Sequence, residues 1–407
     1  MHFVDLHIHS KYSRATSKDL DLENLARYAK MKGLDVLGTG DFSHPQWNQE
    51  LRQRLVEADG IYEYNGIKFI LSNEISLVYT QGGKGRRIHH LILSPTLEIA
   101  DQINEFLKSK GRVDYDGRPI FGFSSIELVE RLMGISKDIM VIPAHAWTPW
   151  FGIFGSMSGF DSLEECFQEK TKHIHAIETG LSSNPEMNWR LSSLDNISLV
   201  SFSDAHSAYP WRLGRECCAF DCKPTYNEIT GAIKEKDKKK FLFTIEFFPE
   251  EGKYHFDGHR NCNFSCEPQE AKKLNNICPR CGNKLTIGVL NRVEELADRE
   301  EDFVPENSIP FKSLIPLSEL IAAALGTTPY SKGTWEVYSR LIDRFKNEFN
   351  VALNVSKEDL EKVVDRRIAE IILKNREGQI EIKPGYDGVY GKIMLDVDKE
   401  NNLKRFI

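Results

Sequence analysis

The sequence lacks several features that would place it in a special class of protein. It contains no run of 18 or more apolar residues, and its N-terminus enters a strand-like pattern directly, without a secretory signal. Low-complexity tracts and fixed-period repeats are missing as well. We therefore expect an intracellular, cytoplasmic protein with no membrane partner.

An excess of positive charge is also missing. The 53 Lys and Arg residues are outnumbered by 60 Asp and Glu residues, which gives a formal net charge of -7. This balance argues against a protein that coats nucleic acid through bulk charge, although local basic patches can still bind phosphates. With 407 residues, of which 41% are hydrophobic and 28% charged, the chain is long enough for two or three globular domains.

Cysteine is present but unevenly distributed. Four of the eight cysteines, Cys262, Cys266, Cys278 and Cys281, follow the pattern C-x3-C-x11-C-x2-C. Four thiolates fill every coordination position of a tetrahedral zinc ion, so such a site is structural rather than catalytic. Without a secretory signal a disulfide framework is the weaker interpretation. We predict one structural zinc ion in a four-cysteine module at residues 249–290.

Strand-like and helix-like segments alternate from residue 1 to 248, which is typical of an α/β fold with a parallel sheet or barrel. The expected strands span 3–9, 36–42, 68–76, 89–94, 139–147, 175–180 and 198–206. From residue 291 to 407 helical patterns dominate. The apolar positions from Leu360 to Ile372 trace one face of a single helix, with Ser356 as N-cap and Gly378 at its end.

Five of the expected strands end in or next to ionisable residues: His7 and His9, Asp41 and His44, Glu74, His145, and Asp204 and His206. Parallel α/β folds place ligand sites at the carboxyl ends of their strands, so these side chains should meet at one rim. Imidazoles and carboxylates are ligands for Zn, Mn or Fe, and one carboxylate can bridge two ions. Two or three such ions can activate water for phosphoester hydrolysis.

The adjacent pair His89 and His90 supplies one more candidate ligand. Neighbouring residues of a strand point to opposite faces, so both imidazoles cannot face the same site. We favour His90, with His89 as the alternative.

Several ordered motifs resemble the PHP (polymerase and histidinol phosphatase) metallophosphoesterases: "DLHIHS", "GTGDFSHP", "SNEIS", "HHLIL", "IPAHAW" and "FSDAH". The resemblance implies a distorted (β/α)7 barrel with two or three divalent cations (Zn, Mn, Mg or Fe). It also implies one ion held by His7, His9, Glu74 and Asp204, a second held by Glu74, His90 and His145, and a third held by His44 and His206. Glu74, Asp204 and His145 would be the catalytic residues.

Two departures from the family pattern affect the third site. The loop "SKYSRATS" lacks a further histidine, and Asp41 is followed by Phe42 where the family commonly has Asp-His. Asp41 is therefore a substitute ligand for the third ion.

Basic and aromatic residues in the loops near the expected rim are candidates for binding DNA, since Arg and Lys take phosphates and Trp can stack on bases. They are Lys84, Arg86, Arg87, Trp147, Trp150, Trp211 and Arg212. Between residues 252 and 292, seven basic residues face three acidic ones, a local net charge of +4, so Arg280 and Lys284 join the candidates. Lys332 in "GTTPYSKG" is another. Each group also has a structural alternative. The residues near the rim could instead anchor the packing of their loops, the basic residues of the cysteine module could only solvate a scaffold, and the segment with Lys332 could be a simple turn that starts a helix.

The order of the expected domains, a barrel followed by a four-cysteine module and a helical region, resembles that of the endonuclease Q family. Sequence segments such as "TTPYSKGTWEVYSRLI" and "GYDGVYG" are also similar to that family. This resemblance implies a DNA repair endonuclease that hydrolyses the phosphodiester 5′ to hypoxanthine, uracil, xanthine or an abasic site. The implied partners are double-stranded or single-stranded DNA with damaged bases and a sliding clamp. A protein that binds such DNA would associate with the nucleoid. The rival hypotheses are a phosphomonoesterase of the histidinol phosphatase type and a non-catalytic DNA-binding or polymerase-accessory protein.

Overall fold

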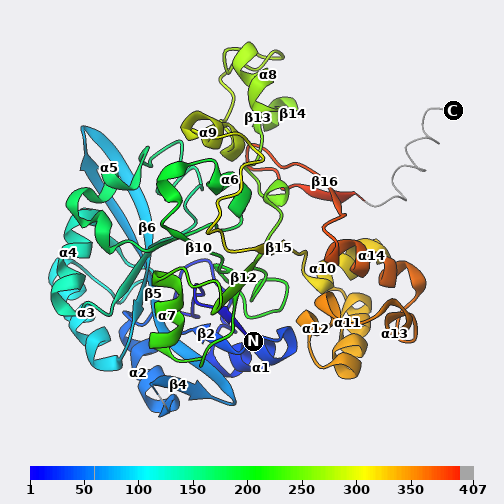
Figure 1. Ribbon diagram of the computed structural model, residues 1–407, viewed down its shortest axis with the longest axis horizontal. Coiled ribbons are helices and arrows are strands. Elements are labelled where there is room, and N and C mark those ends of the chain that lie inside the picture. Colours follow the sequence, from blue (N-terminus) through cyan, green and yellow to red (C-terminus); the bar gives the residue numbers. More distant parts are fainter. Residues whose placement is uncertain (59, 395–407) are drawn as a thin grey trace.

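Strands alternate with helices through residues 1–248 and form a barrel, as the sequence pattern predicts (Figure 1). The computed structural model describes residues 1–58 and 60–394. The barrel strands are β1 (His2–Asp5), β2 (Val36–Gly38), β5 (Ile67–Gln81), β6 (Lys84–Ser94), β8 (Met140–Pro143), β9 (Ala176–Glu178) and β10 (Ser198–Val200). The helices around them are α1 (Leu22–Lys32), α2 (Pro45–Arg54), α3 (Leu97–Lys110), α4 (Ser125–Ile135), α5 (Leu163–Phe167), α6 (Pro185–Trp189) and α7 (Tyr226–Lys234).

The barrel is distorted, as expected. Strands β1, β2 and β5 pair in parallel, but β6 runs antiparallel to both β5 and β8. Two seams have no continuous ladder. Between β8 and β9, the Ala146 N–H donates to the Glu178 carbonyl, and between β10 and β1 a single bridge joins Ile8 to Ala205. These seams lie beside the strand ends that carry the candidate metal ligands.

Further strands extend the barrel sheet on both sides. Among the described residues the resulting sheet has eleven strands, while β9 and β10 pair with each other in a separate two-stranded sheet. The added strands are β3 (Val56–Ala58), β4 (Ile61–Tyr64), β7 (Ile120–Phe121), β11 (Cys217–Phe220), β12 (Phe241–Glu246) and β15 (Phe311–Ser313). One buried cluster fills the barrel with Val4, Leu6, Val36 and Leu91, while a larger one packs the outer face of the sheet against the helices. Because the barrel strands are buried on both faces, their sequences are nearly continuous apolar runs.

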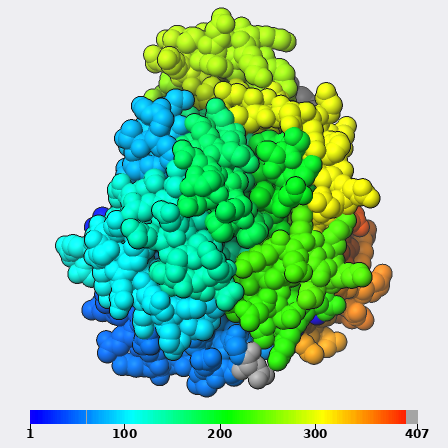
Figure 2. Space-filling model, turned by 60° about the vertical axis from the view of Figure 1, so that its left-hand side comes forward, coloured from blue at the N-terminus to red at the C-terminus, as the bar shows by residue number. Residues whose placement is uncertain are grey.

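A small cysteine-bearing module (residues 253–288) projects from one end of the barrel (Figure 2). It contains β13 (Asp257–His259), β14 (Phe264–Cys266) and α8 (Pro268–Lys273). The end of the described chain returns to it as β16 (Glu381–Lys383) and β17 (Lys392–Met394). Tyr386 bridges to Phe256, and the Arg260 N–H donates to Asp387 Oδ2 at 2.7 Å. The module is therefore stabilised by residues more than a hundred positions away.

The helical body lies beside the barrel (Figure 1). It consists of α10 (Leu317–Leu325), α11 (Lys332–Phe345), α12 (Glu348–Leu353), α13 (Lys357–Glu361) and α14 (Arg366–Arg376). The prediction of one helix starting at Ser356 is wrong. Ser356 caps only α13, and Asp365 starts α14 by accepting a hydrogen bond from the Ile368 N–H.

The helical body is smaller than the region predicted at 291–407. Helix α9 (Val289–Leu296) packs against the barrel, where the Arg292 guanidinium donates to the carbonyls of Phe154 and Phe160. Strand β15 pairs with β12 of the barrel sheet, and the segment between β16 and β17 contacts the cysteine module through Tyr386 and Asp387. Residues 395–407 of the predicted region lie outside the described residues. Within the described part of the chain, no helix is long and apolar enough to cross a membrane.

A buried ion pair joins the helical body to the barrel. The Lys32 ammonium at the end of α1 lies 2.6 Å from Glu348 Oε1 at the start of α12, and both side chains are almost completely buried. Lys32 also donates to the Pro210 carbonyl at 2.9 Å, and the Tyr338 hydroxyl donates to Glu348. The pair therefore connects four separate segments: α1, the loop that follows Asp204, α11 and α12.

We expect Lys32→Met to lower the free energy of unfolding by about 3–5 kcal/mol, because it leaves the buried Glu348 carboxylate without its cation. Urea unfolding followed by fluorescence measures the change, with the exposed Lys30→Met on the same helix as the matched control. Adding Glu348→Gln should recover part of the loss. Equal stability of the Lys32→Met variant and the wild type would show that the pair does not hold the helical body in place.

Candidate metal centre

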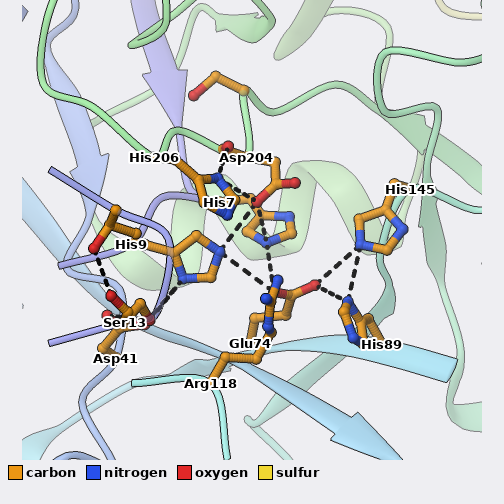
Figure 3. Close-up of polar contacts among 12 residues, drawn as sticks. His7, His9, Ser13, Asp41, Glu74, His89, Arg118, His145, Asp204 and His206 are labelled. Atoms are coloured by element: carbon orange, nitrogen blue, oxygen red, sulfur yellow. Dashed lines mark hydrogen bonds and ion pairs between the residues drawn. The ribbon is translucent and has the colours of Figure 1, made fainter. Parts of the chain in front are cut away.

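Two groups of metal-binding side chains share one carboxylate at the rim of the barrel (Figure 3). The first group is His7, His9, Glu74 and Asp204, and the second is Glu74, His89 and His145. Within each group the candidate ligand atoms all lie within 4.8 Å of one another. Glu74 Oε1 faces His89 Nδ1 at 2.7 Å and His145 Nε2 at 3.0 Å, while Oε2 faces His9 Nε2 at 3.3 Å. This is the arrangement of a carboxylate that can bridge two cations.

The strand ends bring these residues together. His7 and His9 follow β1, Asp204 follows β10 and His145 follows β8, while Glu74 lies within β5, which continues beyond the rim. The backbones are close here, since a side chain at Gly40, where φ is +62°, would collide with the Ile8 carbonyl. The predicted convergence at the carboxyl ends of the strands is therefore present in the structure.

Three non-glycine residues at the centre adopt a left-handed backbone. The φ angles are 48° at Asp41, 31° at His145 and 46° at Asp204. Such conformations cost about 1–3 kcal/mol each and persist where the surrounding structure fixes them. Each residue lies in the turn that follows a barrel strand, and its left-handed backbone directs the side chain over the rim.

Buried carboxylates hold the first two histidines. Glu178 at the end of β9 accepts a hydrogen bond from His7 Nδ1 at 3.0 Å, and Asp41 Oδ1 accepts one from His9 Nδ1 at 3.1 Å. Because an ionised carboxylate only accepts, each Nδ1 must donate, which directs Nε2 of both rings towards Glu74. Glu178 is absent from the predicted site. Its only signal in the sequence is its place at the end of the strand-like run "HAIETG".

The structure reverses the choice between His89 and His90. Residues paired across β5 and β6 point to the same face, and Ser76 pairs with His89 whereas Ile75 pairs with His90. His89 therefore shares the inward face with Glu74. His90 points outward, where its Nε2 lies 2.8 Å from Ser125 Oγ. The prediction of His90 as a ligand is wrong.

We expect His89→Ala to remove one equivalent of bound Mn or Zn and to lower any metal-dependent activity by at least about tenfold, because it takes one of three candidate ligands from the second group. His90→Gln is the matched control: it replaces the neighbouring imidazole outside the centre and should keep the full metal content. Atomic emission on dialysed protein gives the ion count. The reverse pattern would return the ligand role to His90.

Charges within the centre compensate one another. Burial disfavours the charged form of His7, yet Glu178 and Glu74 raise its pKa well above the usual value. Burial also works against the ionised form of Glu74, but His89 and Arg118 lower the pKa of this carboxyl well below its usual range. Burial outweighs the attraction of Glu74 and lowers the pKa of His89 to about 4. The carboxylates are thus balanced by protons and one guanidinium.

These residues fit divalent cations. Among the described residues, the buried Nε2 of His7 has no hydrogen-bond partner, although oxygens of Glu74 and Asp204 lie 3.6 and 3.5 Å away. Neutral imidazole and carboxylate are ligands for Zn, Mn and Fe, and metal binding displaces protons from such groups.

The predicted third ion is not supported by the geometry. His44 stacks on Tyr12 at a centroid distance of 4.5 Å, and His206 packs against His9 at 4.6 Å. Neither belongs to a metal-binding group formed by the described residues. Asp41, the substitute ligand, uses its oxygens to hold His9, Ser10 and Ser13. In this structure Asp41 orients a histidine, and its role as a ligand of a third ion stays a prediction.

The cysteine module also differs from its prediction. Its metal-binding group is His259, Cys262, Cys278 and Cys281, so His259 takes the place predicted for Cys266. Cys266 is buried beside Ala271 and Leu285, and burial raises the pKa of its thiol to about 11. Desolvation acts in the same direction on Cys278, but backbone N–H groups of Arg280 and Cys281 outweigh it and lower the pKa of that thiol to about 7. The module thus holds three thiols and one imidazole in a group suited to a metal ion.

Comparison with known proteins identifies the family. The chain is 33% identical to the lesion-specific endonuclease PfuEndoQ of Pyrococcus furiosus, and its structure matches that crystal structure with a TM-score of 0.87 over 98% of both chains. The chain belongs to the endonuclease Q family. A second endonuclease Q structure, in complex with a 27-mer duplex that carries an abasic lesion at the active site, is 34% identical and gives the same TM-score over 98% of this chain and 97% of that one.

The chain also matches one further relative and one family model. A stretch of 261 residues, 63% of this chain, is 33% identical to the uncharacterized protein MJ0043 of Methanocaldococcus jannaschii, and the chain spans about a third (32%) of that relative. The family model described as MJ0043 C-terminal domain matches residues 316–379. This range coincides with the helical body of the endonuclease Q fold.

The predicted DNA-binding residues of this endonuclease Q chain divide by exposure. Trp147 and Arg86 are buried, so neither is available to DNA: Trp147 donates to Asn188 Oδ1, and Arg86 pairs with Glu165 and lies over the Phe160 ring. The prediction for these two is wrong. Exposed or partly exposed side chains that stay candidates are Lys84, Arg87, Trp150, Trp211, Arg212, Arg280, Lys284 and Lys332.

Arg118 also belongs to the centre, although nothing in the sequence singled it out. Its Nη1 donates to Glu74 Oε2 at 3.1 Å (Figure 3). It lies in the loop before β7, in none of the motifs that carry the family resemblance.

Proposed function

We propose that this chain is a metal-dependent DNA endonuclease that cleaves one strand at a damaged nucleotide. The observation that carries the proposal is the shared Glu74, which joins two ligand groups in a chain that belongs to the endonuclease Q family. A relative of the same fold holds an abasic lesion in duplex DNA at its active site. Two cations held side by side are the common solution for hydrolysis of phosphodiesters.

The chain's own residues position this chemistry. His7, His9, Glu74 and Asp204 would hold one cation, and Glu74, His89 and His145 a second. When bound, these cations supply a water activated near neutral pH and positive charge beside the phosphodiester oxygens. Glu178 and Asp41 keep Nε2 of His7 and His9 directed at the rim, and the Thr148 hydroxyl at 2.9 Å from Nδ1 does the same for His145.

The cysteine module would hold a structural zinc ion through His259, Cys262, Cys278 and Cys281. A set of three thiolates and one imidazole closes the coordination sphere, so this ion stabilises the module and takes no part in hydrolysis. The exposed Arg280 and Lys284 then lie on a rigid projection, where they are suited to bind DNA phosphates.

We further propose deaminated bases as substrates besides abasic sites, with incision 5′ to the lesion. An enzyme that inspects a base must lift it from the stack, and a missing or mispaired base is easier to extrude. Hypoxanthine, uracil and xanthine each carry a carbonyl where the parent base has an amine, so one set of N–H donors can accept all three and reject the parent bases. A sliding clamp is a further proposed partner.

The test uses end-labelled duplexes that carry one uracil, hypoxanthine, xanthine or abasic site, incubated with the protein and Mg, Mn or Zn. An undamaged duplex and p-nitrophenyl phosphate are the controls. One nick directly 5′ to the lesion supports the proposal. Phosphate release from the small ester alone would favour a phosphomonoesterase, and binding without turnover would favour an accessory role.

A further inference from the structure

Arg118 places a permanent positive charge in a centre that otherwise consists of imidazoles and carboxylates. Its side chain is 24% exposed, whereas that of Glu74, its partner, is fully buried. The guanidinium contacts Glu74 Oε2, the oxygen that faces His7 and His9 rather than His89 and His145. Arg118 thus lies at the solvent side of the centre, where a substrate must enter.

The backbone on both sides of Arg118 is fixed. The buried Asp116 accepts hydrogen bonds from the N–H groups of Arg14 and Arg118, both at 3.1 Å. A side chain at Gly117 would collide with the Asp41 carboxylate, so the loop runs directly over the residue that holds His9. Beyond Arg118, the Pro119 carbonyl accepts from the Ser76 N–H at 3.0 Å. The guanidinium is therefore carried by a rigid part of the centre.

Glu74 uses little of the hydrogen-bonding capacity of this side chain. A guanidinium offers five N–H donors in a planar fork, which matches two oxygens of a phosphate. Among the described residues, Glu74 accepts the one side-chain hydrogen bond that Arg118 forms. If divalent cations balance the charge of Glu74, the guanidinium needs another anion, and a phosphodiester at the rim supplies one.

The sheet beside Arg118 gives the nucleic acid strand a surface to lie on. Ile120 follows Arg118 by two residues and pairs with Ser76, which places it on the face of β5 that carries Glu74. The same face continues through Val78, which pairs with Arg87. Ile120 is 49% exposed, Val78 is 40% exposed and Arg87 is exposed. An apolar surface with an arginine at each end suits a sugar–phosphate chain.

We propose that Arg118 is a catalytic residue that binds the non-bridging oxygens of the phosphodiester to be cleaved. The inference rests on the proposed endonuclease function. An arginine fork aimed at these oxygens stabilises the negative charge that grows on them during hydrolysis. The competing interpretation is that Arg118 only neutralises Glu74 and never contacts the substrate.

A double-variant cycle between protein and DNA separates the two interpretations. Binding of a lesion duplex is measured by fluorescence anisotropy in Ca²⁺, with either a native phosphate or an uncharged methylphosphonate 5′ to the lesion. The proteins are the wild type, Arg118→Ala, Arg118→Lys and the matched control Arg112→Ala. Arg112 lies in the same loop, but its side chain is 73% exposed and pairs with Asp114.

We expect the methylphosphonate to weaken binding by the wild type and by Arg112→Ala roughly tenfold or more, and to change binding by Arg118→Ala less than about twofold. Arg118→Lys should fall between them, since it keeps the charge and loses the fork. The single-turnover nicking rate should fall roughly 10²–10³-fold in Arg118→Ala and stay within about twofold in Arg112→Ala.

An equal loss of binding on methylphosphonate DNA for the wild type and Arg118→Ala would overturn the inference, as would a nicking rate of Arg118→Ala within about threefold of the wild type. Thermal unfolding controls for folding, and if Arg118→Ala is unfolded, Arg118→Lys completes the cycle. If the wild type nicks lesion DNA but the effect of the methylphosphonate on binding does not depend on Arg118, only the role of Arg118 is refuted. A wild type that neither nicks nor binds lesion DNA refutes the proposed function as well.

Discussion

Replacing Glu74 with glutamine should lower the rate of strand cleavage by about 10³-fold or more and leave duplex binding within about threefold of the wild type. Glu74 is the one residue common to both ligand groups, so its loss weakens both candidate sites at once. The amide keeps the shape of the side chain but removes the negative charge and presents an N–H donor where a cation would bind. The variant therefore tests the bridge without opening a cavity in the barrel.

The comparison needs three measurements on the same preparations. Single-turnover nicking gives the rate, anisotropy gives the affinity for lesion DNA, and atomic emission gives the number of bound ions. Glu130→Gln on the exposed face of α4 is the matched control and should behave as the wild type. The role of Glu74 would be refuted by a Glu74→Gln enzyme that keeps its nicking rate and its metal content.

His259→Ala should remove the metal ion from the cysteine module, whereas Cys266→Ala should retain it. His259 lies in the group with Cys262, Cys278 and Cys281, while Cys266 packs in the small core of the module. Binding of a structural zinc ion contributes about 10–16 kcal/mol to the folding of small modules. Loss of one ligand should therefore unfold residues 253–288, and Cys278→Ser should do the same.

Zinc content and limited proteolysis of the full chain distinguish the two arrangements. We expect one equivalent of zinc less and new cleavage sites within the module for His259→Ala and Cys278→Ser, with neither change for Cys266→Ala. If the module also contacts DNA, the first two variants should lose affinity for the duplex. Zinc loss in Cys266→Ala together with zinc retention in His259→Ala would restore the four-cysteine arrangement.

The local pattern of the sequence was sufficient for the fold and for much of the centre. Alternating apolar strands and amphipathic helices predict an α/β fold with a parallel sheet or barrel, because such strands bury both faces, and the resemblance to the PHP metallophosphoesterases implies the barrel. The ionisable residues at the strand ends then follow from topology, since parallel strands end at one rim. His7, His9, Glu74, His145 and Asp204 meet there in the structure.

The errors arose where tertiary register decides. His89 and His90 alternate across one strand, and only the pairing of β5 with β6 determines which one faces inward. His259 joins the cysteines because β13 folds back on β14, a contact that cysteine spacing does not encode. Arg86 lies in β6 and Trp147 in the loop after β8, and both side chains are buried where Glu165 and Asn188, respectively, bind them.

The sequence also did not indicate the residues that hydrogen-bond to the candidate metal ligands. Glu178 and Arg118 act on residues 171 and 44 positions away, and each is a single charged residue with no repeated pattern around it. Hydrogen bonds between distant segments leave no periodicity in a sequence. Such residues become visible only when the strand ends are placed together.

The binding of two cations on either side of Glu74 is tested most directly by anomalous diffraction from crystals of the full chain grown with excess Mn²⁺ and measured on both sides of the Mn absorption edge. We expect two Mn peaks at the barrel rim, one beside His7, His9 and Asp204 and the other beside His89 and His145. A rim without anomalous peaks, or peaks only at other surfaces, would show that Glu74 does not join two metal sites.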